Sequence, residues 1–237
     1  MSSPSTDDVV RELAPDGVLR VVLNLGNPVL VQGTPEAPTG VTVDIAHEVA
    51  RRLGVEVELL PVGAAREAYA ALVEGRARLG FLAVEPAREE GVRFTVPYVQ
   101  IEGVHAVRPD AFVTSSAEVD AAGTTIGVRR GSAYDLYLTR TLTAATIVRG
   151  DEAHEVFEEQ GLDVLAGVRQ PVEAYAAEHG LRVLEPAFQQ ISQAVALPRT
   201  VSDATAAEVD GVVAELKAAG FVAASLERAG QVATVPA

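Results

Sequence analysis

The sequence contains no cysteine, and its basic residues are arginines with the single exception of Lys217. Without cysteine the chain has no disulfide bond, no thiolate chemistry and no cysteine-ligated metal. Its four histidines lie far apart and none has the spacing of a helical zinc site, so we expect no metal and no other cofactor. No apolar run reaches the roughly 18 residues that a membrane-spanning helix needs.

A recognisable leader is also missing from the sequence as it stands. The opening residues, MSSPSTDDVV, have neither the basic region nor the apolar segment of a signal peptide. We therefore expect a cytoplasmic protein if Met1 is the native start, and a periplasmic or extracellular one if a leader has been removed. The net charge of −14 repels phosphate groups, so we expect neither nucleic acid nor an anionic membrane as a partner.

The chain is rich in hydrophobic residues, and their spacing predicts strands and helices in a regular order. It has 237 residues, 48% of them hydrophobic, which is enough for one large domain or two small ones. Its first part alternates between apolar strand patterns and helical spacing, which indicates βαβ units with a parallel sheet and helices on both faces. The predicted elements are strand 17–28, helix 41–54, strand 55–62, helix 66–77 and strand 78–84. In helix 66–77 we expect Tyr69, Leu72 and Val73 to point inward.

A second stretch of the chain repeats this order. The elements predicted there are a strand and helix in 124–142, strand 145–150, helix 151–161, strand 162–169, helix 171–180 and strand 181–185. A final helix is predicted over 202–221, with Ser202 or Asp203 as its N-cap. Two similar α/β lobes predict a cleft between them. Ligands of open α/β sheets lie beyond the carboxyl ends of the strands, so the polar turns NLGNP, VEPAR, RRGSAYD and VRQP are expected to line it.

Six segments in this order resemble the bacterial solute-binding proteins of the polar amino-acid type, the receptors of ABC importers. They are GVLRVVLNLGNP, GVTVDIAHEVARRLGVEVELLPV, FLAVEPAREEGVRFTVPYV, GTTIGVRRGSAYDLYL, LDVLAGVRQPVEAYA and ELKAAGF. The resemblance implies an α/β protein with the two-lobe fold of type II periplasmic-binding proteins, in which helices flank mixed sheets. Crossover strands are then expected near 98–107 and 188–197. Lobe 1 would contain 1–100 and 195–237 with both termini, and lobe 2 would contain 101–194.

The same resemblance implies a function without catalysis. The protein would be a monomer that closes on a small carboxylate-containing molecule and presents it to an ABC permease. Arg88 matches the arginine that binds the ligand's α-carboxylate in that family. A guanidinium suits this role because it donates two parallel N–H bonds to a carboxylate. Without the resemblance, the sequence favours Arg88 as a surface residue paired with Glu89 or Glu90.

The sequence also departs from the family pattern near the ligand. Hydroxyl residues are usual five and three positions before the arginine, where this chain has Ala83 and Glu85. The family's acidic residue for the ligand ammonium is missing after strand 162–169, where Arg169 and Gln170 stand.

The first loop lacks an aromatic platform and offers Asn24 and Asn27. We therefore expect a polar or acidic ligand, with a second acidic group met by Arg169 or Arg129. A neutral α-amino acid is not expected unless Glu85 or Glu102 accepts its ammonium.

Two further positions and two alternative functions stay open. Ser132 begins a helix after a glycine, which suits either binding of a polar ligand or a plain N-cap. Glu102 lies in an apolar stretch, where a charge needs a partner or the cleft. On the same scaffold a dehydratase like cyclohexadienyl dehydratase would use Glu85 or Glu102 as a general acid. A ligand-sensing module is the remaining alternative.

Overall fold

The computed structural model describes residues 5–237, which divide into two compact units. Unit 1 contains the chain up to Gln100 together with Ser192–Ala237, and unit 2 contains Ile101–Ile191. The chain passes between the units twice, within the long strands β7 (Val99–Val107) and β11 (Arg182–Pro198). None of the helices in the described part of the chain is long and apolar enough to cross a membrane.

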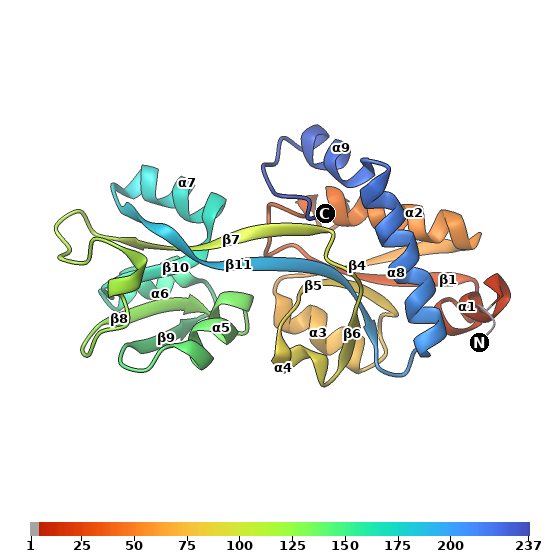
Figure 1. The fold of residues 1–237 in the computed structure, drawn as a ribbon, viewed down its shortest axis with the longest axis horizontal. Helices are drawn as coiled ribbons and strands as arrows, with labels where there is room; N and C mark the ends of the chain where they lie inside the picture. The colour runs from red at the N-terminus through yellow and green to blue at the C-terminus, as the bar shows by residue number, and fades with distance from the viewer. Residues whose placement is uncertain (1–4) are drawn as a thin grey trace. The chain divides into compact units, whose positions relative to one another are not determined.

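Unit 1 is built on a mixed sheet with the order β4-β1-β5-β11 (Figure 1). The strands β1 (Val18–Asn24), β4 (Glu56–Val62) and β5 (Leu79–Ala83) are parallel, whereas β11 runs antiparallel to β5. A short strand, β6 (Val92–Phe94), also pairs with β11, and β2 (Gln32–Thr34) forms a separate hairpin with β3 (Ala37–Thr39). The predicted βαβ units are present, but the antiparallel β11 makes the sheet mixed.

Helices cover both faces of this sheet, as Figure 1 shows. On one side α3 (Ala65–Val73) packs against β1 and β5, and α4 (Pro86–Glu89) follows β5. On the other side α2 (Val41–Leu53) packs against β1 and β4. It is covered in turn by the helices α1 (Thr6–Leu13), α8 (Asp203–Ala218) and α9 (Phe221–Arg228).

In unit 1, residues that commonly end or begin helices predicted the ends of α2 and α8 correctly. Gly54 ends α2 in the left-handed conformation with φ of 69°, which glycine adopts without steric cost. Ser202 is the N-cap of α8, and its hydroxyl accepts a hydrogen bond from the backbone of Thr205 at 3.2 Å. The expectation that Val73 points inward is wrong, because its side chain is 53% exposed at the last position of α3.

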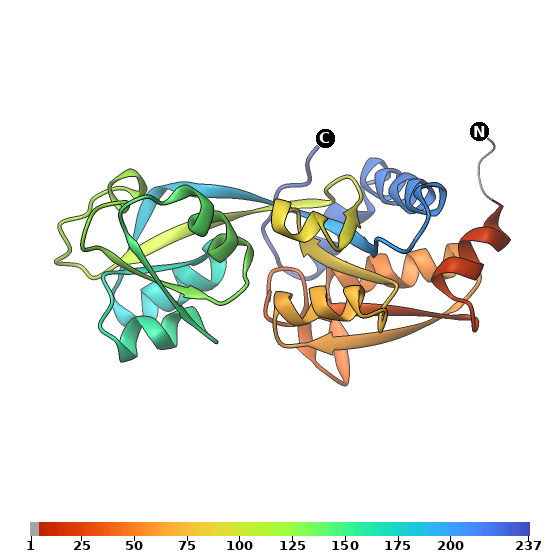
Figure 2. The ribbon, with the colours of Figure 1, turned by 90° about the horizontal axis from the view of Figure 1, so that it is seen from below.

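Unit 2 contains the remaining strands of this same sheet, in which β7 lies between β11 and β10 (Val164–Val168) (Figures 1 and 2). Beyond β10 come β8 (Thr125–Arg129) and β9 (Thr146–Gly150), both parallel to their neighbours, while β10 is antiparallel to β7. The helices are α5 (Ala133–Thr141), α6 (Ala153–Glu159) and α7 (Arg169–His179), with one turn of 3-10 helix at Ser116–Glu118. Helix α7 begins two residues before its predicted start, so Pro171 is its third residue.

Successive side chains of β10 point to opposite faces of the sheet and pack into two separate apolar cores of unit 2. Val164 and Ala166 pack with the residues of α5, whereas Leu165 packs with Phe157 of α6 and Val172 of α7. This sheet therefore has a helix layer on each face, which is what fixes the position of the turns that follow β8 and β10.

The core of unit 2 contains a histidine, His105 of β7, which is 2% exposed. Its ring stacks on Phe188 with centroids 4.1 Å apart, and neither ring nitrogen has a hydrogen-bond partner among the described residues. Burial lowers the pKa of His105 to about 3 because the charged imidazolium cannot be solvated there. The imidazole is thus neutral in the folded protein at pH 7.

We expect acid to destabilise the protein through this residue. The unfolded chain binds a proton at His105 near pH 6.5, whereas the folded chain does so near pH 3. Stability is therefore lost as the pH falls below 6.5, by about 2 kcal/mol between pH 7 and pH 5. Urea unfolding of the wild type and of His105→Leu at both pH values measures this loss. An equal loss in the two proteins would contradict the assignment.

Candidate functional site

In unit 1 the candidate site lies at the carboxyl ends of the neighbouring parallel strands β1 and β5. Parallel strands end at the same edge of a sheet, so the turn after Asn24 and the turn after Ala83 share that edge. The second turn begins helix α4, with Glu85 as its N-cap residue and a proline in its first turn. This arrangement brings Asn24, Asn27, Glu85 and Arg88 to one end of the unit.

Arg88 is a buried charge at this edge, with 3% of its surface exposed. Its Nη1 donates a hydrogen bond to the carbonyl oxygen of Ala83 at 3.0 Å, which holds the guanidinium at the end of β5. Burial lowers the pKa of Arg88 to about 10, while the negative charge of Glu85 opposes that loss of proton affinity. Arg88 is therefore positively charged at neutral pH, and it is not the exposed surface arginine of the alternative interpretation.

Glu85 is buried more completely than Arg88, with 1% of its surface exposed. It precedes Arg88 by three residues, and its carbonyl oxygen accepts the backbone N–H of Arg88 at 2.9 Å. An acid and a guanidinium, both buried, thus occupy one turn of helix at the end of β5.

The two asparagines of the first loop hold the turn itself. The side-chain oxygen of Asn24 accepts the backbone N–H of Gly26 at 3.0 Å, and that of Asn27 accepts the N–H of Val29 at 3.3 Å. Such Asx turns are a usual role for asparagine after a strand. Both side chains remain partly exposed, so a ligand role for them stays a prediction.

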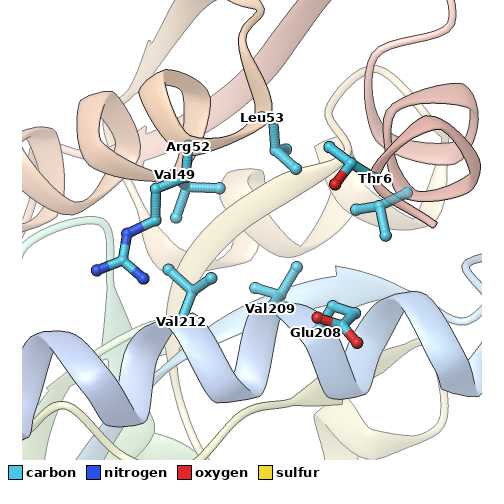
Figure 3. Close-up of a pocket in the computed structure, with 8 residues that line it drawn as sticks. Thr6, Val49, Arg52, Leu53, Glu208, Val209 and Val212 are labelled. Carbon is cyan, nitrogen blue, oxygen red and sulfur yellow. The ribbon is translucent and has the colours of Figure 1, made fainter. Parts of the chain in front are cut away.

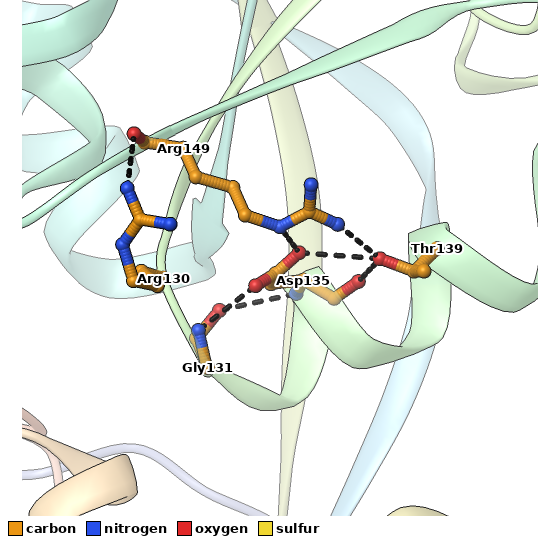
Figure 4. Close-up of polar contacts among 6 residues, drawn as sticks. Arg130, Gly131, Asp135, Thr139 and Arg149 are labelled. Carbon is orange, nitrogen blue, oxygen red and sulfur yellow. Dashed lines mark hydrogen bonds and ion pairs between the residues drawn. The ribbon is translucent and has the colours of Figure 1, made fainter.

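In unit 2 the corresponding edge is formed by the parallel strands β8 and β10. After β8, the hydroxyl of Ser132 accepts the backbone N–H of Asp135 at 3.1 Å as the N-cap of α5. Figure 4 shows the buried carboxylate of Asp135 between two elements. It accepts the N–H of Gly131 at 2.8 Å and the Nε of Arg149 at 2.8 Å. Arg149 also donates to the hydroxyl of Thr139 at 2.6 Å.

This network fixes the RRGS turn at the end of β8. Arg130 extends it, because its Nη2 donates to the carbonyl oxygen of Arg149 at 3.2 Å (Figure 4). Arg129 is engaged as well: its Nε donates to the carbonyl of Asp151 at 3.0 Å, and its Nη2 lies 2.7 Å from a carboxylate oxygen of Glu152.

After β10, Arg169 stands at the first position of α7 and is surrounded by three carboxylates. Its Nε donates to Glu102 of β7, its Nη1 lies 3.0 Å from Glu173, and Nη1 and Nη2 reach Glu185 at 2.7 and 3.0 Å. These hydrogen bonds raise the pKa of Arg169, so its charge is permanent. We call Glu102, Arg169, Glu173 and Glu185 the Arg169 cluster; its formal charge is −2 at pH 7.

The Arg169 cluster changes how two predicted site residues are interpreted. Arg169 and Arg129 were expected to meet a second acidic group of the ligand, yet each is already paired with carboxylates of unit 2. These pairings weaken the argument for a dicarboxylate ligand, and contact of either arginine with a ligand stays a prediction. Gln170, the next residue of α7, is half-buried, and its contact with a ligand stays a prediction.

The surroundings of Glu102 favour its ionised form, which cannot act as a general acid. One of its carboxylate oxygens accepts from Arg169 and the other accepts the side-chain amide of Gln190 at 2.8 Å. The bonds to Gln190 and Arg169 lower the pKa of Glu102. A carboxyl group that is ionised at neutral pH has no proton to donate, so the arrangement gives no support to Glu102 as the acid of a dehydratase.

A small pocket of about 150 Å³ lies elsewhere in unit 1, between α1, α2 and α8 (Figure 3). It is lined by Thr6, Val9, Val49, Arg52, Leu53, Glu208, Val209 and Val212. The carboxyl end of α2 leads into the start of β4, so this pocket lies toward the amino ends of the parallel strands. Arg52 is paired there with Glu48 and Glu215. Over residues 5–237 no group of His, Cys, Asp or Glu is arranged to hold a metal ion.

Several of these contacts could not be foreseen from the sequence. Glu173 lies four residues after Arg169 on a predicted helix, so this pair was available from spacing. Glu185 and Gln190 come from β11, which was predicted as a strand 181–185 and a separate crossover near 188–197, and no local signal connects them to Arg169. The pairing of Asp135 with Arg149 likewise depends on the register of β8 and β9.

Comparison with known proteins identifies the family of the chain, and solved structures share its fold. The profile of the bacterial extracellular solute-binding proteins, family 3, matches residues 19–231. A mutant of ArgBP from T. maritima has a TM-score of 0.75 at 21% identity, covering 93% of this chain and 98% of that one. A putative binding component of an ABC transporter from Wolinella succinogenes DSM 1740, complexed with lysine, has a TM-score of 0.74 at 20% identity. It covers 90% of this chain and 95% of that one.

Two other similarities bear on the alternatives. AncCDT-1, an ancestral amino acid-binding protein described as a precursor of cyclohexadienyl dehydratase, has a TM-score of 0.74 at 21% identity, covering 92% and 98% of the two chains. The virulence sensor protein BvgS of Bordetella pertussis (strain Tohama I) is 33% identical over 138 residues, which is 56% of this chain. The chain spans 11% of the length of that sensor. The structural similarities, all near 20% identity, show the fold.

Proposed function

Because the chain belongs to family 3 of the bacterial extracellular solute-binding proteins, we propose that it binds an amino acid and delivers it to an ABC importer. Solved structures of the same fold include an amino acid ABC transporter substrate-binding protein bound to L-arginine, a putative binding component of an ABC transporter complexed with lysine, and an ancestral arginine-binding protein bound to glutamine. Their ligands suggest the chemical class to test here, an α-amino acid with a polar side chain.

The observation that carries this proposal is the buried guanidinium of Arg88. Burying a positive charge is costly, and a buried guanidinium at the end of a strand is well suited to an anionic ligand group. Arg88 is held at the carboxyl end of β5 by the carbonyl of Ala83, the place where α/β proteins bind ligands. We propose that Arg88 binds the α-carboxylate of the amino acid by donating two parallel N–H hydrogen bonds to it.

Binding between two lobes is part of the same proposal. Lobe 1 would comprise 1–100 and 195–237, and lobe 2 would comprise 101–194. The ligand would favour the closed form by touching both, since a ligand shifts a hinge equilibrium only through contacts that differ between the two forms. The two passages of the chain through β7 and β11 support a double hinge.

A ligand-sensing module is the second candidate function. The observation that favours it is the 33% identity to a segment of the virulence sensor BvgS. In that case the amino acid would act as a signal, and the binding residues would be the same. The two candidates differ in their partner, a permease in one case and a signalling protein in the other, and not in the ligand site.

A thermal-shift screen of the purified protein tests the binding proposal. One of the twenty standard amino acids should raise the midpoint of unfolding, because a ligand that binds only the folded state stabilises it. At a hundredfold excess over Kd the gain is about 2.7 kcal/mol. Dicarboxylates without an amino group serve as the comparison set and should give a smaller shift. No shift with any amino acid would contradict the proposal.

A further inference from the structure

The last residues of the chain, 231–237, form a tail that runs from the end of α9 back to strand β7 (Figure 1). Thr234 forms an isolated antiparallel bridge with Gln100 of β7. Its carbonyl oxygen accepts the N–H of Gln100 at 2.7 Å, and its own N–H donates to the carbonyl of Gln100 at 3.0 Å. The tail is thus bound to β7 through backbone groups, and this contact does not depend on the side chain at position 234.

The tail is held at both of its ends as well as in its middle. At its start, the backbone N–H of Gln231 donates to the carbonyl oxygen of Leu226 in α9 at 2.9 Å. At its end, the Nζ of Lys217 in α8 donates to the carbonyl oxygen of Ala237 at 3.3 Å. Thr234 therefore meets β7 between two points that are fixed to helices of unit 1.

The residue that the tail binds lies where the chain leaves unit 1. Gln100 is the last residue of unit 1 before the chain enters unit 2, and Ser192 is the first residue after the chain returns. The side-chain amide of Gln100 donates to the hydroxyl of Ser192 at 3.2 Å, so both passages are connected there. In unit 2, β10 pairs with residues 103–107 of β7. Residues 101–102 are the part of β7 between these two sets of contacts.

We propose that the tail is a strap that limits the bending of the hinge by holding Gln100 against unit 1. This inference rests on the proposed function, in which β7 and β11 form a double hinge. Hinge bending changes the backbone dihedral angles of a few residues. A residue whose N–H and carbonyl are both bonded to one partner cannot turn freely without breaking those bonds. The strap therefore narrows the range of hinge conformations in the ligand-free protein.

A restrained hinge also changes what the ligand has to do. A ligand that closes two lobes must remove the conformational freedom that the hinge still has, and that loss opposes binding. Because the strap has already removed part of this freedom, we expect it to favour binding without touching the ligand.

The absence of cysteine makes a direct test possible, because two introduced cysteines can be spin-labelled specifically. His47→Cys on α2 and Glu155→Cys on α6 place one label in each unit, both at exposed positions. Pulsed electron paramagnetic resonance of the ligand-free protein then measures the distribution of distances between the labels. Deletion of residues 232–237 should broaden this distribution about twofold or more, because a segment that loses its hydrogen bonds samples more conformations.

Two substitutions at one position provide the matched comparison. Thr234→Pro removes the N–H that donates to Gln100 and should broaden the distribution while the length of the chain is kept. Thr234→Ala keeps both backbone bonds, removes only an exposed side chain and should leave the width unchanged. Circular dichroism checks the fold of each protein. A wild-type width in the folded deletion variant, or equal widths in Thr234→Pro and Thr234→Ala, would overturn the strap.

Calorimetry separates this inference from the proposed function. The standard amino acid with the largest thermal shift should bind the deletion variant about threefold or more weakly than the wild type, since a looser hinge has more freedom to lose. If no amino acid binds the wild type, the proposed function fails, whereas the ligand-free distance distributions still decide whether the tail restrains the hinge.

Discussion

Replacing Arg88 with alanine is expected to weaken binding of the amino-acid ligand by about 2–5 kcal/mol, which corresponds to a factor of roughly 30 to several thousand in Kd. The loss is large because the guanidinium is buried at the end of β5 and its contact with a carboxylate is charge-assisted. Arg88→Lys should recover little of it, since an ammonium cannot reproduce the two parallel N–H bonds. Calorimetric titration of the three proteins measures the effect.

The control for this experiment is Arg51→Ala. Arg51 has the same charge, but its side chain is 70% exposed and is paired with Glu48 in an i,i+3 contact on α2. Its removal should leave the affinity unchanged, because exposed ion pairs contribute at most about 1 kcal/mol and this one lies outside the candidate site. Circular dichroism of each variant checks that the fold is retained. Wild-type affinity in folded Arg88→Ala would remove Arg88 from the site.

Phe157→Ala is expected to cost about 3–5 kcal/mol of folding stability, the usual range when a buried phenylalanine is truncated. The ring is fully buried in unit 2 among residues of β7, β10 and α7, and the guanidinium of Arg108 lies 4.5 Å above its centroid. Its removal leaves a cavity at the centre of one of the two cores of this unit. Denaturant unfolding measures the loss.

Phe112→Ala is the matched control, because Phe112 belongs to the same unit and is 99% exposed. It should change stability by less than about 0.5 kcal/mol. Hydrogen exchange then reports where the loss in Phe157→Ala occurs: amides of β8 and β10 should exchange faster, and those of β1 and β5 should change less. A loss below 1 kcal/mol, or uniform acceleration in both units, would contradict the separate core of unit 2.

The elements that the sequence predicted well are those with strong local signals. Helix α2 ends at Gly54 and helix α8 begins after Ser202 because both residues act through their own backbone or side chain. The two βαβ units of the first part were predicted for the same reason, since their apolar periods and caps agree. Strand β11 was predicted as residues 181–185 plus a separate crossover, but it runs unbroken from Arg182 to Pro198.

The sequence predicted which residues lie at the candidate site, but it did not predict which of them form ion pairs with one another. The place of Arg88 after a buried strand, and the departure at Glu85, were both visible in the sequence. The partners of Arg169 were not, because Glu102 and Glu185 come from strands 67 and 16 residues away in the chain. An arginine in a polar turn looks available for a ligand until the fold shows which acids surround it. The contact of Arg169 with a second acidic group of the ligand therefore stays a prediction.

The most direct test of the account is a crystal structure of the protein with the amino acid that gives the largest thermal shift. The account predicts a carboxylate oxygen of the ligand about 2.7–2.9 Å from the guanidinium nitrogens of Arg88, the length of a charge-assisted hydrogen bond. An amino acid bound with its carboxylate away from Arg88 would contradict the central claim that this arginine is the anchor of the ligand.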